Sequence, residues 1–121
     1  MSKRIVPLLA AACLAVIAGG AEAVDVRAGV LRGDYPALLP ISRYDLRPDD
    51  LAFAGAVLAD EDNATTGRFM GHSFETTTLA VPPEGATEAL AGLLDDGVRY
   101  IVVDAMGEEL AALSDQAAEA G

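Results

Sequence analysis

Short apolar stretches with strand composition alternate along this chain with segments of helical periodicity, and this alternation restricts the possible folds most strongly. Strand patterns lie at 26–31, within 72–81 and at 98–103. Helical patterns begin at Pro48, at Ala86 and near Gly107. This order is typical of parallel strands joined by right-handed crossovers. We therefore predict an α/β fold with three layers in βαβαβα order, in which helices cover both faces of a parallel sheet.

The first helical segment is expected to open at Pro48, because proline suits the first helical position and Asp49 and Asp50 favour a helix N-terminus. Its apolar spacing predicts that one stripe of side chains is buried, namely Leu51, Ala54, Val57 and Leu58. The helix is predicted to end in the acidic run 60–63, before a turn at 65–67.

The other two helices have clearer apolar faces. The second carries Ala86, Leu90, Leu93 and Leu94 on one face, and Gly97 is a suitable left-handed cap. The third is predicted to bury Leu110, Leu113 and Ala117.

The strands differ in composition, which predicts their places in the sheet. The segment 72–81 is half polar and rich in threonine, so it suits an outer strand. The segment 98–103 is nearly all apolar, as expected where helices cover both faces. An apolar edge strand promotes aggregation, and no later segment could cover this one. We therefore expect the sheet to continue in a longer protein, of which this chain is the N-terminal part.

Residues 1–23 have the pattern of a secretory signal peptide. Lys3 and Arg4 precede an apolar run over 5–18, and Ala21-Glu22-Ala23 provides small residues for cleavage between Ala23 and Val24. The run is shorter than the roughly 20 residues that a membrane-spanning helix needs. We therefore expect residues 24–121 to form one α/β domain in the periplasm. Removal of Cys13 would leave this domain without a disulfide.

The charge of the chain excludes one class of partner. Its net charge is −11, and no lysine occurs after Lys3. A strongly acidic surface repels phosphate groups, so nucleic acid binding is not expected.

Few residues could support catalysis, and we expect no enzyme activity. His72 is the only histidine, no serine lies in a nucleophile elbow, and the glycines form no phosphate-binding pattern. The acidic run 60–63 resembles part of a calcium loop, but Ala64 and Gly71 stand where oxygen ligands are needed. No metal site and no cofactor are therefore predicted.

Ligands of open α/β sheets bind beyond the carboxyl ends of the strands. Two segments are expected at that edge, the long connection 33–47 and the turn 104–107. Their polar, aromatic and sulfur-containing side chains make up the predicted small-molecule site: Asp34, Tyr35, Arg43, Tyr44, Asp104 and Met106. An alternative is that Tyr35 and Tyr44 pack over helix ends instead.

Several of these segments together resemble a known family. The signal peptide, the strand Val26-Arg27-Ala28-Gly29-Val30-Leu31 and the helix 55–63 are similar to the start of a type I periplasmic solute-binding protein, the branched-chain amino acid receptor-like component of an ABC transporter. The runs 32–36 and 62–71 more specifically resemble the substrate-binding proteins found with pyrroloquinoline quinone-dependent alcohol dehydrogenase systems. The resemblance spans most of residues 24–121 but only the first part of such two-lobed proteins.

The resemblance implies a fold and a function. The domain would be a partial N-terminal lobe of the binding-protein fold, and its partners would be a small ligand, an ABC permease and a periplasmic dehydrogenase system. Amino acid receptors hold a ligand carboxylate after the third strand, where this chain has Asp104, so an ordinary amino acid ligand is not expected. The alternative is a periplasmic partner or scaffold of an alcohol-oxidising system without a transport role.

Overall fold

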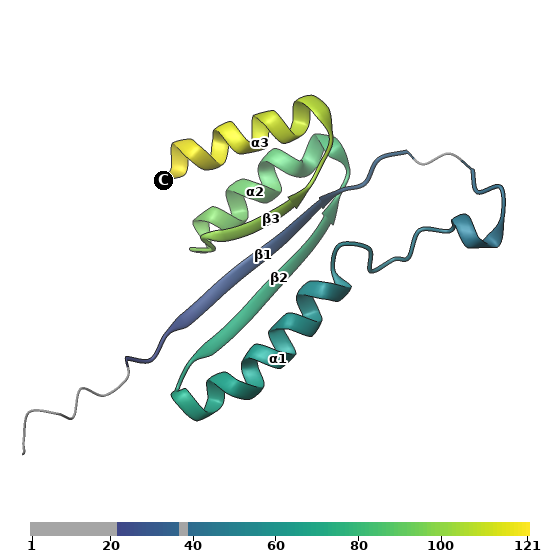
Figure 1. Ribbon diagram of the computed structural model, residues 1–121. Helices are drawn as coiled ribbons and strands as arrows, with labels where there is room; N and C mark the ends of the chain where they lie inside the picture. Colours follow the sequence, from purple (N-terminus) through teal and green to yellow (C-terminus); the bar gives the residue numbers. More distant parts are fainter. Residues whose placement is uncertain (1–21, 37–38) are drawn as a thin grey trace, which may run out of the picture.

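The computed structural model describes residues 22–36 and 39–121, so nearly all of the predicted signal peptide lies outside the described residues. Within these described residues, three strands, three helices and two short 3-10 turns follow one another (Figure 1). These elements are β1 (Asp25–Gly33), η1 (Arg43–Asp45), α1 (Ala54–Met70), β2 (Ser73–Val81), η2 (Pro83–Gly85), α2 (Ala86–Asp95), β3 (Tyr100–Asp104) and α3 (Gly107–Ala120). In this part of the chain, no helix combines the length and the apolar character needed to cross a membrane.

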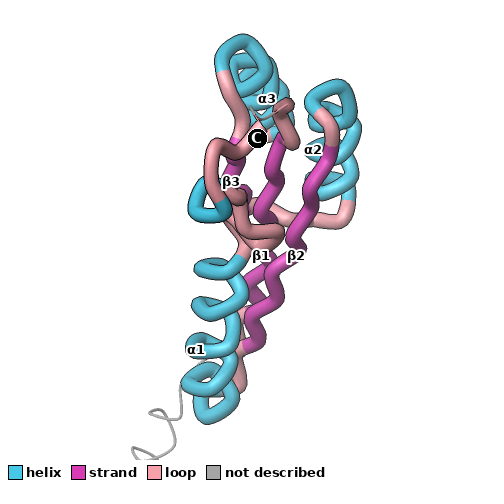
Figure 2. The backbone as a smooth tube through the Cα atoms, turned by 90° about the vertical axis from the view of Figure 1, so that its right-hand side faces the viewer, coloured by secondary structure: helices cyan, strands magenta, loops and turns pink. Residues whose placement is uncertain are grey.

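The sheet is parallel, with the strand order β2-β1-β3. This arrangement confirms the predicted α/β class and the outer position of the threonine-rich strand. Helices α1 and α2 lie on opposite sides of the sheet (Figure 2). The helix that follows β1, α1, lies on one face of the sheet, and the helix that follows β3, α3, lies on the other face. The connections after these two neighbouring strands therefore leave the sheet in opposite directions. The point between β1 and β3 is the topological switch point, where open α/β sheets bind ligands.

The core lies between the sheet and the pair α2 and α3. Leu31 of β1, Leu90 of α2 and Leu113 of α3 are its largest fully buried side chains. At Gly29, an added Cβ would come within 3.1 Å of Leu93 Cδ1, so the absent side chain lets α2 approach the sheet closely. The predicted inward face of α2 is confirmed, and Gly97 has the expected left-handed φ of 82°.

Helix α1 differs from the prediction in its buried face. Val57 and Leu58 are 48% and 60% exposed, so the predicted apolar stripe is wrong. The half-buried or buried positions are Ala56, Asp60, Ala64 and Gly67. They have helical spacing but belong to another face of the helix, whose mostly small side chains allow close approach to β2.

Both ends of α1 also differ from the prediction. The helix begins at Ala54 and not at Pro48, because Ala52 has a left-handed φ of 70° that interrupts a right-handed helix. Residues 60–63 lie inside the helix, which continues through the predicted turn at 65–67 to Met70. Gly71, with a φ of 74°, provides the left-handed C-cap.

Strand β3 is less covered than predicted. It lies at the edge of the sheet, and Tyr100 and Val102 are 67% and 65% exposed. The prediction that helices cover both of its faces is therefore wrong, since α1 packs on β2 at the other edge and leaves this face of β3 open. Leu113 of α3 is buried as predicted, whereas Leu110 and Ala117 are exposed.

Candidate functional site

A tyrosine joins the ends of β1 and β3 at the carboxyl edge of the sheet. The hydroxyl of Tyr35 accepts a hydrogen bond from the Met106 backbone N–H, at 2.6 Å, and donates one to the carboxylate of Glu109. Met106 is the N-cap of α3, and Glu109 is the third residue of that helix. In a capping box, the acidic side chain at this position bonds directly to the N-cap N–H. Here the phenol of Tyr35 lies between the two groups and links β1 to α3.

Gly33 makes room for this arrangement. A Cβ added to Gly33 would lie 3.1 Å from Glu109 Oε2 and 3.2 Å from the Tyr35 hydroxyl oxygen. Both atoms lie at the ends of flexible side chains, so an alanine at Gly33 would displace the carboxylate or the phenol by a few tenths of an ångström.

The environment of Tyr35 keeps its hydroxyl protonated. Burial raises the pKa of Tyr35 above its ordinary value, and the hydrogen bond to Glu109 raises it further. The nearby charge of Asp104 acts in the same direction, whereas the hydrogen bond from Met106 lowers the pKa of Tyr35. A protonated phenol can donate to Glu109 across the neutral pH range.

Glu109 also has one unused acceptor. Its Oε1 atom is buried and has no hydrogen-bond partner among the described residues. A buried carboxylate oxygen normally has a partner, in the protein or in a bound molecule. The site therefore offers a buried acceptor to a group that can donate a hydrogen bond.

Arg32 forms the opposite side of this edge, and sequence reasoning did not include it in the site. Its guanidinium donates to Asp34 Oδ1 at 2.8 Å and to the carbonyls of Asp49 and Leu51 at 3.1 and 2.7 Å. It also lies 4.7 Å from the ring centroid of Phe53. These contacts fasten both ends of the connection 34–53 to the sheet. Because its side chain is only 11% exposed and its charge lies beside the carboxylate of Asp34, Arg32 is a poor binder of an anionic ligand.

Four of the six predicted site residues gather at this edge. Asp34 and Tyr35 follow β1, Asp104 ends β3 as the register partner of Arg32, and Met106 caps α3. Tyr35 packs at the start of α3, as the alternative reading of this residue expected.

Arg43 and Tyr44 lie elsewhere. They belong to η1 in the part of the connection that projects from the domain (Figure 1). The guanidinium of Arg43 donates to the Tyr44 hydroxyl at 2.9 Å, and Tyr44 is 82% exposed. The structure therefore does not bring these two residues to the other four, and Tyr44 does not pack over a helix end.

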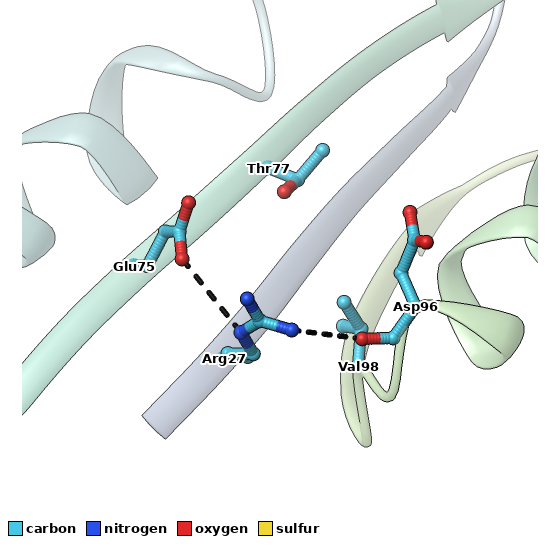
Figure 3. A pocket seen from close by; sticks show the side chains of 5 residues that line it. All are labelled: Arg27, Glu75, Thr77, Asp96 and Val98. Atoms are coloured by element: carbon cyan, nitrogen blue, oxygen red, sulfur yellow. Dashed lines mark hydrogen bonds and ion pairs between the residues drawn. The ribbon is translucent and has the colours of Figure 1, made fainter. Parts of the chain in front are cut away.

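A polar hollow lies near the amino ends of the strands, away from the switch point. It has a volume of about 290 Å³ and is lined by Arg27, Glu75, Thr77, Asp96 and Val98 (Figure 3). Arg27 spans it, donating to the Asp96 carbonyl at 2.9 Å and lying 3.7 Å from Glu75 Oε2. Both groups of this ion pair are more than half exposed, so the pair is weak. The hollow thus lacks the buried, oriented groups found at the carboxyl edge.

His72 has a structural contact. Its Nδ1 accepts a hydrogen bond from the Val24 backbone N–H at 3.0 Å, just after the C-cap of α1. This bond joins the start of β1 to the start of β2. Within residues 22–36 and 39–121, no three His, Cys, Asp or Glu side chains cluster in a way that could hold a metal ion.

Comparison with known proteins gives no relative. No protein-family model, no curated protein and no solved structure matches this chain.

Proposed function

We propose that this chain is a ligand-binding lobe of an extracytoplasmic solute-binding protein, serving an ABC transporter linked to pyrroloquinoline quinone-dependent alcohol oxidation. The fold supports ligand binding, because the parallel order β2-β1-β3 creates a switch point between β1 and β3. The transporter and the alcohol-oxidising system come from the resemblance of the sequence to that family. The predicted signal peptide supports a place outside the cytoplasm.

One observation favours this function above the others. Acceptor groups from three separate segments lie at the carboxyl edge of the sheet around the switch point. Asp34 follows β1 and accepts from Arg32, Asp104 ends β3, and Glu109 of α3 has one buried carboxylate oxygen with no hydrogen-bond partner among the described residues. Such an edge suits a small neutral or cationic solute with hydrogen-bond donors. It disfavours a carboxylate, because the nearest cation, Arg32, already contacts Asp34 and two carbonyl oxygens. A hydroxylated compound of the alcohol class fits these requirements.

Ligand-observed NMR tests this proposal, because it detects weak binding to a single lobe. The probes are short-chain alcohols, diols and monosaccharides, with monocarboxylates and amino acids as anionic and zwitterionic comparisons. We expect saturation transfer to hydroxylated probes, reduced in Glu109→Gln and Asp104→Asn. The matched control is Thr77→Val in the hollow near the amino ends of the strands, and this variant should bind as the wild type does. Binding only of carboxylates, or equal effects of all three variants, would contradict the proposal.

A second function has support from a different part of the molecule. The projecting part of the connection carries Leu39, Ile41 and Leu46, and Ile41 is 99% exposed. Exposed apolar side chains of this kind are common where proteins dock. They favour the alternative of a periplasmic partner or scaffold for an alcohol-oxidising system. Under this alternative, the wild type would co-purify with a periplasmic dehydrogenase and would bind no solute. Ile41→Ser would abolish the co-purification.

A further inference from the structure

The predicted signal cleavage site coincides with the point where the chain becomes fixed to the domain. The signal pattern predicts Val24 as the first mature residue. In the structure, Val24 is the first described residue with hydrogen bonds to the rest of the domain. Its N–H donates to His72 Nδ1 at 3.0 Å, and its carbonyl accepts from the Ser73 N–H at 2.9 Å. Sequence pattern and hydrogen bonding thus point to the same residue.

The residue after Val24 adds a further contact at this end of the sheet. Asp25 Oδ1 accepts a hydrogen bond from the Ser73 hydroxyl at 2.7 Å. Asp25 and Ser73 are also register partners, the first of the parallel pair β1 and β2. These bonds fix the position of the Val24 nitrogen relative to the imidazole of His72.

Cleavage would change the chemistry of that nitrogen. Hydrolysis of the peptide bond between Ala23 and Val24 consumes one water molecule, leaving a carboxylate on Ala23 and an α-amine on Val24. An α-amine is mostly protonated at neutral pH, so a neutral amide donor becomes a positively charged donor. Hydrogen bonds from charged donors are stronger than those between neutral groups. The bond to His72 should therefore strengthen when the signal peptide is removed.

The surroundings of the Val24 nitrogen suit a positive charge. His72 follows Gly71, the C-cap of α1, and a Cβ added to Gly71 would lie 4.0 Å from the Cβ of Ala23. The nitrogen therefore lies near the C-terminal end of a 17-residue helix, where the backbone dipole favours a cation. Because His72 Nδ1 accepts the bond, the imidazole offers a lone pair there.

We propose that His72 binds the mature N-terminus. Removal of the signal peptide releases an α-ammonium group at Val24, which donates to His72 Nδ1 and holds the start of β1 against the start of β2. This gives the only histidine of the chain a role in maturation. The inference rests on the predicted cleavage site and is independent of the proposed solute-binding function.

Amine labelling tests this proposal selectively. Residues 24–121 contain no lysine, so the α-amine of Val24 would be the only primary amine of the mature chain. The full chain is exported from a bacterial host, and mass spectrometry identifies its first residue and the rate at which an acylating reagent labels the N-terminal peptide. We expect the wild type to begin at Val24. We also expect it to be labelled at least about fivefold more slowly than His72→Ala, the factor that one ordinary hydrogen bond gives.

Two controls isolate the hydrogen bond. His72→Asn places an amide oxygen at the position of Nδ1, since both atoms are two bonds from Cβ, so labelling should stay slow. A chain that begins at Ala23, produced by proteolytic removal of a fusion partner, carries its amine one residue away from His72. This chain should be labelled fast in both the wild-type and the His72→Ala background.

Circular dichroism verifies that each variant is folded, and the comparison of the two start sites needs no substitution. An exported protein that begins elsewhere than at Val24 would overturn the proposal. So would equal labelling rates for the wild type and His72→Ala, equal rates for the two start sites, or a His72→Asn variant that is labelled as fast as His72→Ala.

Discussion

The close packing of α1 on β2 can be tested by one glycine substitution. A Cβ added at Gly67 would lie 2.7 Å from Phe74 Cε2 and 3.0 Å from the His72 carbonyl oxygen. Replacing glycine by alanine inside a helix normally stabilises it by about 0.5–1 kcal/mol. At Gly67 we expect overpacking of about 1–3 kcal/mol to outweigh this gain, because a ring and a backbone oxygen cannot both move away. The net effect should be a loss of about 1–2 kcal/mol.

Gly92 of α2 is a matched control. Like Gly67, it is the fourth residue from the end of its helix, and its carbonyl accepts a hydrogen bond from the C-cap N–H. An added Cβ at Gly92 would meet no atom within 4 Å, so Gly92→Ala should stabilise the domain by about 0.5–1 kcal/mol.

Urea unfolding followed by far-ultraviolet circular dichroism measures both variants, since the chain has no tryptophan. We expect the unfolding midpoint to fall in Gly67→Ala and to rise in Gly92→Ala. With an m-value of about 1 kcal/mol/M, the two midpoints should differ by roughly 2 M. An equal rise in both variants would refute the close approach of α1 to β2.

Three further predictions follow from single contacts. Because the pKa of Tyr35 is raised, its contribution to the free energy of unfolding is complete below about pH 10 and is lost as the pH rises through the folded value; stability measured across this window should fall less steeply in Tyr35→Phe than in the wild type. Arg32→Met should lower the free energy of unfolding by about 2 kcal/mol and make the connection 34–53 sensitive to limited proteolysis. The control Arg27→Met, at an exposed ion pair, should change neither quantity much. Equal effects of the two variants would show that Arg32 does not hold the connection to the sheet. His72→Ala removes the hydrogen bond to Val24, so thermal unfolding should show a loss of about 1 kcal/mol in the free energy of unfolding, with solute binding unchanged. A loss of solute binding in the folded variant would instead assign His72 to the site.

The sequence predicted those parts of the fold in which large apolar side chains face the core. Leu90 and Leu93 of α2 and Leu31 of β1 are such residues, and their spacing identified the elements and their buried faces. The face of α1 was mispredicted because Ala56, Ala64 and Gly67 are small and lie toward the sheet, while the larger Val57 and Leu58 are exposed. Hydrophobic periodicity weighs large residues more heavily, so it chose the wrong face.

The residues of the candidate site were also predicted only in part. The rule that ligands bind at the carboxyl edge of a parallel sheet brought Asp34, Tyr35, Asp104 and Met106 together. Glu109 was missed because it lies 74 residues from Tyr35, and no local pattern links them. Arg32 was missed because it ends a strand, where a charged residue usually indicates only the boundary. Arg43 and Tyr44 were included because the whole connection 33–47 was expected at the carboxyl edge, whereas the part with these two residues projects from the domain (Figure 1).

Residue-resolved NMR of the labelled protein tests solute binding at the switch point most directly. The protein is titrated with the short-chain alcohols, diols and monosaccharides used above. We predict that amide chemical shifts change at residues 33–36 and 104–109, where β1, β3 and α3 meet, and that the shifts saturate with increasing probe. Shift changes centred on Arg27, Thr77 and Asp96, which line the hollow near the amino ends of the strands, would contradict this prediction. The absence of any saturable change would contradict it as well.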